Sequence, residues 1–241
     1  MIAAAALRQE IVFDPQTPSP SRGETLARYR RLREIGVRHH TNVLKFLAKD
    51  AVLQHARRLG LAVGKTIVLD SMDELPLAFD LAIYNAPVGR SRAIDRYANS
   101  ARSTPGSEEA VMLEAMRNAR FAVLLAQRRH PSAGLIVTDL FRKIDLWLVD
   151  EGLEVSMPDG AAFATRYYAS EPFVMTAGVA LPVDRDALER AIESAPHLMR
   201  KSPVEAIQDR RFAEAVYRGA IEDGTTENVV YRDPIGTGDE A

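Results

Sequence analysis

The chain has 241 residues, a length that suits one large domain with a sizeable hydrophobic core. Apolar residues make up 46% and charged residues 27%, and the formal net charge of −2 predicts no general attraction to nucleic acid or to anionic membranes. There is no cysteine, which excludes disulfides, thiolate metal sites and cysteine nucleophiles and fits a protein of the reducing cytoplasm.

The first 23 residues are predicted to be a flexible arm and linker, because residues 14–23 hold three prolines. The short apolar start is not preceded by basic residues, so no secretory signal is expected. No stretch has the roughly 20 apolar residues of a membrane span. We expect the chain to act without contact to a membrane.

After the linker, one α+β domain is predicted over residues 24–224, followed by a flexible tail at 225–241. The domain has three parts, which are helical over 24–130, β-rich over 134–183 and helical over 184–222.

The first helical region, from Arg22 to Gly60, is rich in basic residues. It holds ten lysines or arginines against three acids, an excess that suits a phosphate backbone or an acidic protein partner. These residues are scattered around the predicted helices with few aromatic residues between them. A solvated basic surface is therefore the more ordinary interpretation.

Next come four carboxylates between residues 68 and 80, and they are Asp70, Asp73, Glu74 and Asp80. Carboxylates of this density are able to hold a metal ion, so we assign no catalytic residue but keep Asp70, Asp73 and Glu74 as candidates. The more ordinary interpretation is the start of a helix. Asp73 is its expected N-cap because Pro76 then falls in the first turn, and the acids complement the helix dipole. Asp80 is expected to face water.

Residues 107–130 have the pattern of one long helix. Ser107 is its expected N-cap, Glu108 and Glu109 favour its start, and Pro131 ends it. Its many small apolar residues predict close packing against another helix.

From residue 134 on, the apolar period changes from that of a helix to that of a strand. Five short β-rich runs follow, separated by connections of turn type, and they begin near residues 134, 144, 153, 161 and 173. Such short connections join antiparallel neighbours, so we expect a four- or five-stranded meander or a small barrel. Asp184 and Ser202 are the expected N-caps of two closing helices.

No catalytic constellation has the residue types and the spacing that its chemistry needs. His39 and His40 are adjacent in a predicted helix, so their side chains point about 100° apart and do not easily share one ion. There is no zinc signature and no G-x-S-x-G elbow, and the Gly-Lys-Thr at 64–66 lacks the earlier glycine of a phosphate-binding loop. We therefore expect no metal and no cofactor.

Two surfaces are the expected places to bind a partner. One is the basic helical region, where the candidate contacts are Arg30, Arg31 and Arg38. The other is the outer face of the sheet. One tyrosine of the pair at 167–168 must lie there, and we take Tyr168 together with Arg166 as candidate contacts.

The segments "IVLDSMDE", "STPGSEEAVMLEAM", "GLIVTDLFR" and "FVMTAGVALPV" occur in this order within residues 26–184. In this succession the chain resembles a family of uncharacterised bacterial proteins that often carry a C-terminal SEC-C motif. That motif is a cysteine-rich, zinc-binding segment associated with protein–protein contacts. Because this chain has no cysteine, the resemblance transfers no zinc ligand, and it implies no activity.

The sequence thus favours a non-enzymatic, cytoplasmic interaction or adaptor protein, with a protein as its partner and self-association into a homo-oligomer left open. A second hypothesis is a nucleic-acid-associated protein that uses the basic helices and binds less tightly as salt rises. A third is a metal-dependent hydrolase, which requires the acids at 70–74 to converge with His39, His40 or another acid.

Overall fold

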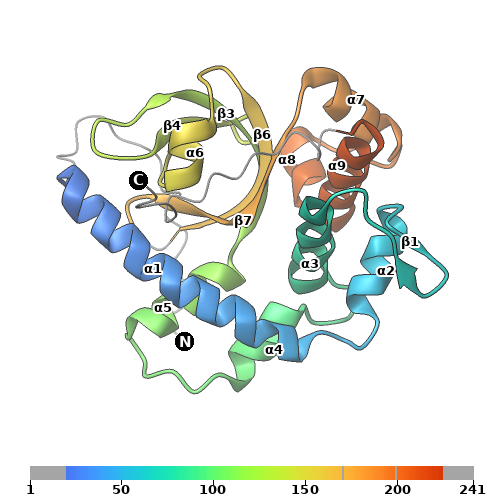
Figure 1. Ribbon diagram of the computed structural model, residues 1–241, viewed down its shortest axis with the longest axis horizontal. Coiled ribbons are helices and arrows are strands. Elements are labelled where there is room, and N and C mark those ends of the chain that lie inside the picture. Colours follow the sequence, from blue (N-terminus) through green and yellow to red (C-terminus); the bar gives the residue numbers. More distant parts are fainter. Residues whose placement is uncertain (1–19, 170, 199, 225–241) are drawn as a thin grey trace, which may run out of the picture.

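A closed barrel of five strands is the framework against which the helices pack (Figure 1). The computed structural model describes residues 20–169, 171–198 and 200–224, so most of the predicted N-terminal arm and all of the predicted tail lie outside the described residues. The strands are β3 (Arg120–Arg129), β4 (Leu135–Asp139), β5 (Ile144–Leu148), β6 (Ala162–Ala169) and β7 (Val174–Pro182). Their order around the barrel is β3-β4-β5-β7-β6, with β5 and β7 parallel and the other pairs antiparallel. The predicted α+β class and small barrel are confirmed.

Helices precede, interrupt and follow the barrel. The elements before it are α1 (Arg22–Val43), η1 (Leu44–Phe46), α2 (Ala51–Arg58), the β1 (Ala62–Val63) and β2 (Thr66–Ile67) hairpin, η2 (Met72–Glu74), α3 (Leu75–Tyr84), α4 (Ala93–Ser100) and α5 (Glu108–Arg117). Later elements are α6 (Glu151–Ser156), α7 (Arg185–Glu193), α8 (Pro203–Gln208) and α9 (Arg210–Glu222). In Figure 1, α1 runs along one side of the barrel, and α3 lies with α7, α8 and α9 on another. In the part of the chain that the structure describes, no helix has the length and apolarity to cross a membrane.

The segment predicted as one helix over 107–130 is a helix followed by a strand. Helix α5 ends at Arg117, and β3 begins at Arg120. Both faces of β3 are buried, because Phe121 packs under helices outside the barrel while its neighbour Ala122 points inside. A strand covered on both sides has a continuous apolar run, which periodicity does not distinguish from a buried helix. The β structure therefore starts earlier than predicted.

The run predicted as a strand at 153–157 is helix α6 instead. The carboxylate of Asp150 accepts a hydrogen bond from the backbone N–H of Leu153 (3.1 Å) and so caps this helix. Its second oxygen accepts a hydrogen bond from the Thr176 hydroxyl (2.6 Å), which ties α6 to β7. Helix α6 is thus part of the connection between β5 and β6.

Ser71 caps the acidic segment, so the prediction of Asp73 as N-cap is wrong. The Ser71 hydroxyl accepts from the N–H of Asp73 (3.2 Å), and the Glu74 carboxylate accepts from the N–H of Ser71 (3.4 Å), which makes a capping box. The single turn η2 separates this box from α3. Pro76 therefore still falls in the first turn of α3, where its missing N–H costs nothing.

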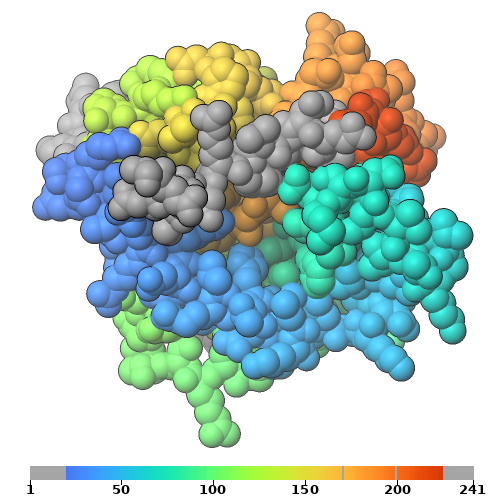
Figure 2. Space-filling view, in the orientation of Figure 1, coloured from blue at the N-terminus to red at the C-terminus, as the bar shows by residue number. Residues whose placement is uncertain are grey.

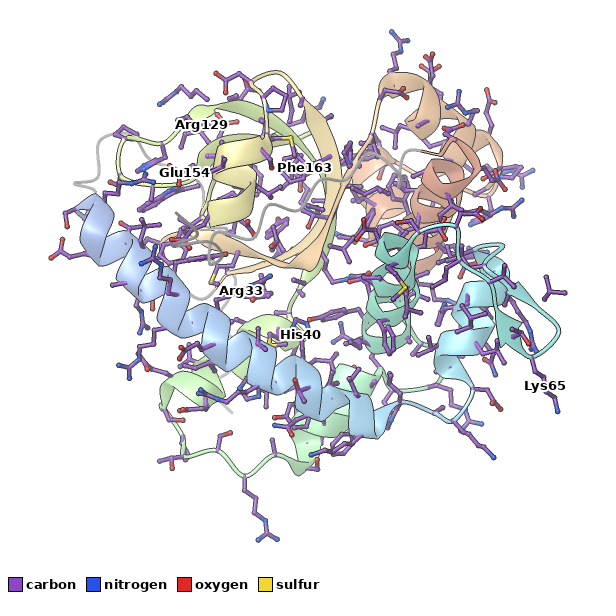
Figure 3. The ribbon with its side chains drawn as sticks, in the orientation of Figure 1. Arg33, His40, Lys65, Arg129, Glu154 and Phe163 are labelled. Carbon is purple, nitrogen blue, oxygen red and sulfur yellow. The ribbon has the colours of Figure 1, made fainter. Side chains whose placement is uncertain are left out.

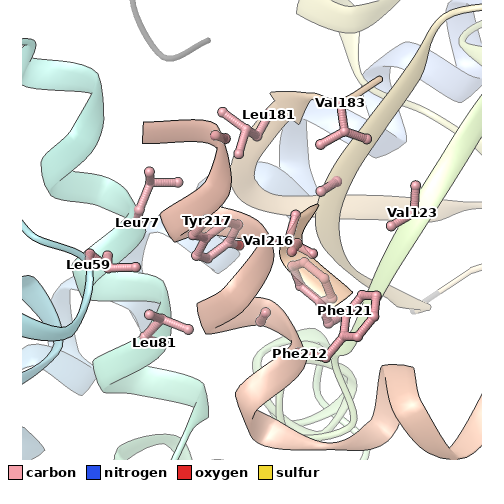
Figure 4. Close-up of a cluster of buried hydrophobic side chains, with 14 of the residues drawn as sticks. Leu59, Leu77, Leu81, Phe121, Val123, Leu181, Val183, Phe212, Val216 and Tyr217 are labelled. Carbon is pink, nitrogen blue, oxygen red and sulfur yellow. The ribbon is translucent and has the colours of Figure 1, made fainter. Parts of the chain in front are cut away.

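Apolar side chains fill three regions. One lies between the barrel, α3 and α9, around Phe121 and Tyr217 (Figure 4). A second fills the barrel itself, where Phe163 is completely buried (Figure 3). The third lies between the barrel, α1, α4 and α5 and includes Leu32 and Met112. Since both sides of the barrel wall are covered, a charged side chain on either side needs a partner.

Candidate functional site

A buried ion pair joins the barrel to the helices beside it. Arg166, on the outer side of β6, donates from Nε to Asp80 Oδ1 (3.0 Å) and from Nη2 to Asp80 Oδ2 (3.1 Å). The Tyr217 hydroxyl of α9 donates to the same Oδ2 (3.1 Å), and the Arg166 guanidinium lies 4.7 Å from the centre of the Tyr84 ring. Both charged residues are only 6% exposed. The pair therefore fixes α3 and α9 against β6.

These positions correct two predictions. Asp80 does not face water, because α3 turns it toward the barrel, where it meets Arg166. Tyr168 is not on an open outer face either: it is 1% exposed, and its hydroxyl lies under α1 close to Gly36. The outer surface of the sheet is covered by helices, so of the two contacts predicted there only Arg166 reaches a concave surface, as the floor of a pocket.

This pocket has a volume of about 470 Å³ and lies where the end of α3, the loop to α4, and the starts of β3 and α9 meet. We call it the arginine pocket, because its lining includes Arg90, Arg92, Arg120, Arg142, Arg166 and Arg210. The carboxylates of its lining are Asp95 and Asp209. Two walls are tied together by Asn85, whose side-chain amide donates to the carbonyl oxygen of Arg210 (2.9 Å).

Three of the six arginines are held by a carboxylate. Arg92 donates to both oxygens of Asp95 (2.7 and 2.8 Å), and Arg142 donates to Asp139 (2.6 Å). Arg166 is held by Asp80 as described. These guanidinium groups are fixed in position, and their charges are compensated.

The two acids of the lining are occupied by neighbouring cations. Hydrogen bonds from Arg92 keep the pKa of Asp95 below its ordinary value. Hydrogen bonds from Arg211, and from Lys201 (2.6 Å), lower the pKa of Asp209 strongly. Both acids are therefore ionised at neutral pH and already neutralised, so neither cancels the charge of a further arginine.

Arg90, Arg120 and Arg210 are exposed, and none of them forms an ion pair with a carboxylate of the described residues. Arg120 lies beside the phenol of Tyr167, which is neutral at physiological pH. Among the described residues, three positive charges without a carboxylate partner thus line one concave pocket. Guanidinium groups in such a place bind carboxylate or phosphate oxygens through paired N–H donors.

Of the three candidate acids that the sequence singled out, Glu74 has a structural role. The Glu74 carboxylate accepts from the N–H groups of Asp70 (2.9 Å) and Ser71, and Asp73 lies in the first turn of η2. Within the described ranges, no three histidine or carboxylate side chains lie close enough together to hold a metal ion. The convergence that a metal-dependent hydrolase requires is therefore not present among these residues.

Most basic residues of α1 form ion pairs with glutamates from later segments of the chain. Arg30 pairs with Glu151 (2.7 Å), and Arg31 pairs with Glu108 (2.5 Å). Arg38 lies 3.6 Å from Glu109. Helix α1 and the segment after it form a continuous band on the face seen in Figure 2, and most arginines of the α1 part are paired with glutamates. Partner binding by these three arginines stays a prediction.

The adjacent histidines of α1 have separate partners. His39 bonds to the Tyr97 hydroxyl (2.7 Å) and to the carbonyl oxygen of Glu109 (2.9 Å). His40, labelled in Figure 3, bonds to the hydroxyl of Tyr84 (3.0 Å), whose ring lies under Arg166. Through this bond α1 supports the floor of the arginine pocket.

Acid is expected to destabilise the protein through His40 and His55. Burial lowers the pKa of each to about 4, whereas the unfolded chain has the ordinary value of about 6.5. Between these values the unfolded state binds the proton, so stability is complete above pH ~6.5 and is lost as the pH falls toward about 4. Urea unfolding should give a free energy that is about 2 kcal/mol per histidine lower at pH ~5 than at pH ~7. The double variant His40→Gln, His55→Gln should flatten this profile; an unchanged slope would contradict the assignment.

The match to a family model covers residues 23–227. The chain belongs to a family of unknown function, DUF7986. The matched range spans α1 to α9 and so includes every element that lines the arginine pocket. No curated protein and no solved structure matches the chain. That the sequence belongs to an uncharacterised family, as its resemblance implied, is confirmed.

Proposed function

We propose that this protein is a non-enzymatic binding protein that recognises an anionic group in the arginine pocket. The observation that supports the proposal is the set Arg90, Arg120 and Arg210, three exposed guanidinium groups in one pocket that lack carboxylate partners among the described residues. Most exposed arginines elsewhere in the described residues are paired with a carboxylate, so three in one pocket that have no carboxylate partner among these residues favour an external anion.

The lining favours binding over catalysis. A general acid or base works best when its pKa lies near the operating pH. Burial raises the pKa of the Tyr84 hydroxyl far above neutrality, and Asp95 and Asp209 have lowered pKa values because cations hold them. The groups that remain, arginines and the amides of Asn85 and Gln208, bind and orient ligands.

A cytoplasmic location is part of the proposal and rests on the lack of cysteine. Nucleic-acid binding through α1 has weaker support, since the α1 arginines are paired with glutamates.

Calorimetric titration of the purified protein with inorganic phosphate at low salt tests the proposal. We expect saturable binding that each of Arg90→Gln, Arg120→Gln and Arg210→Gln weakens about tenfold, the effect of losing one charge-assisted hydrogen bond. The triple variant should not bind measurably.

The matched control is the triple variant of Arg102, Arg128 and Arg129, which are also exposed and unpaired with carboxylates of the described residues but lie outside the pocket. Replacing these three by glutamine changes the net charge equally and should leave binding intact. Equal losses in both triple variants would mean that only overall charge matters, and absence of binding to the native protein would overturn the proposal.

A further inference from the structure

We infer that the ligand of the arginine pocket is the phosphate monoester of a small molecule, whose uncharged part lies along α8. This inference rests on the proposed function and narrows it to one class of ligand. It depends on two features: the placement of the three unpaired arginines, and the extension of the pocket toward Val204 and Gln208.

The three arginines come from three separate segments. Arg90 lies in the loop between α3 and α4, Arg120 begins β3, and Arg210 begins α9. A carboxylate presents two oxygens in one plane, and one guanidinium fork satisfies both. A phosphate monoester has three terminal oxygens in a tetrahedral arrangement and carries a charge of about −1.5 to −2 at pH 7. Donors arriving from three segments match the tetrahedral anion better than the planar one.

The floor of the pocket is suited to a dianion rather than to a larger number of charges. Arg92, Arg142 and Arg166 are already neutralised by Asp95, Asp139 and Asp80. Only the three unpaired arginines have no carboxylate partner among the described residues, and a phosphate monoester with a charge of about −1.5 to −2 compensates half or more of their positive charge. A triphosphate would bring more negative charge than these groups balance.

The pocket does not end at the arginines. A second hollow of about 340 Å³ shares Arg120, Arg142 and Gln208 with the arginine pocket and adds Val204 to the lining. Val204 and Gln208 both belong to α8. Val204 is 41% exposed and offers an apolar contact, and Gln208 offers an amide with both donors and an acceptor. Groups of this kind bind a neutral polar body such as a sugar or a nucleobase.

The dimensions agree with a small organic phosphate. Ligand pockets in proteins have volumes of roughly 300–1,000 Å³, and both hollows fall in that range. Inorganic phosphate alone would occupy only the arginine pocket and leave the α8 side empty. A ligand with a phosphate at one end and a hydroxyl-bearing body at the other would contact both hollows at once.

The test compares inorganic phosphate, a sugar phosphate, AMP and adenosine by calorimetric titration with the full chain. We expect at least one of the two monoesters to bind about tenfold or more tightly than inorganic phosphate, and adenosine not to bind. Gln208→Ala should weaken that monoester about fivefold, the loss of one hydrogen bond to its uncharged part, and should weaken inorganic phosphate, which is held by the three arginines, less than that. The Gln208 side chain is exposed, so this substitution should not disturb folding.

The outcomes separate this inference from the proposed function. If inorganic phosphate binds but neither monoester binds more tightly, the anion site stands and the monoester inference is overturned. A single-stranded RNA oligomer that binds much more tightly than AMP would also overturn it, because the pocket would then belong to a longer phosphate-binding surface. If no phosphate compound binds, the proposed function fails as well.

Discussion

Replacing Asp80 by alanine is expected to lower the free energy of unfolding by about 3–5 kcal/mol. The substitution leaves the Arg166 guanidinium buried, with its two bonds to Asp80 removed and no other carboxylate paired with it in the described residues. It also removes the hydrogen bond from the Tyr217 hydroxyl to Asp80 Oδ2. Equilibrium urea unfolding at neutral pH measures the effect, and the slope with denaturant shows whether the transition stays two-state.

The control removes both charges together. In the double variant Asp80→Leu, Arg166→Met, apolar side chains of similar size fill the space and no buried charge is left alone. Its stability should recover most of the loss, because an ion pair at such a site adds little beyond what apolar packing provides. A loss below about 1 kcal/mol in Asp80→Ala would show that solvent compensates Arg166, and the pair would not be the fixed floor of the pocket.

Asp80 and Ser202 show which structural roles can be predicted from the sequence of this protein and which cannot. The capping box at Ser202 is local, since the serine and Glu205 bond to each other across one turn, and the prediction is confirmed. The role of Asp80 is set by a residue 86 positions away on another element. Nothing in the helical pattern around Asp80 indicates that partner, so the pattern alone predicts exposure.

The sequence does not predict strand β3 either, for a related reason. Its side chains point alternately into the barrel and into the region between the barrel, α3 and α9, and both environments are apolar. The pattern of Phe121 to Ala126 is therefore uniform, and the preceding helix signal extends over it. The start at Arg120 depends on the pairing of β3 with β6 and β4, which only the folded chain reveals.

The arginine pocket has no motif that would indicate it. Its six arginines lie in two loops, on two strands and at the start of a helix, with no regular spacing. The sequence draws attention to α1 because basic residues are concentrated there, yet their glutamate partners come from distant segments. Charge density along the chain is thus a poor guide, and the useful criterion is which charges remain unpaired after folding.

Substituting Gly134 by alanine is expected to cost about 4 kcal/mol of stability, through two additive causes. Gly134 has φ +78°, a conformation that costs an L-residue about 1–2 kcal/mol. A Cβ at this position would overlap the carbonyl oxygen of Leu148 and lie 2.9 Å from Val149 Cα, and these are backbone atoms of the barrel that have no room to rotate away. The turn is fixed from both sides, because the His130 N–H donates to the Gly134 carbonyl (2.9 Å) and the Trp147 indole donates to the Ala133 carbonyl (2.7 Å).

Gly160→Ala is the matched control, since Gly160 has nearly the same φ (+81°) but no atom within 4 Å of the place that a Cβ would take. The Gly160→Ala variant should lose only the stability that the positive φ costs an alanine, about 1 kcal/mol. Urea unfolding of the two variants then separates backbone conformation from overlap. Equal losses would mean that the β4–β5 wall shifts to admit a methyl group. Because Arg142 of the arginine pocket lies in the loop that joins β4 to β5, a wall that shifts in this way would also weaken the argument for a preformed site.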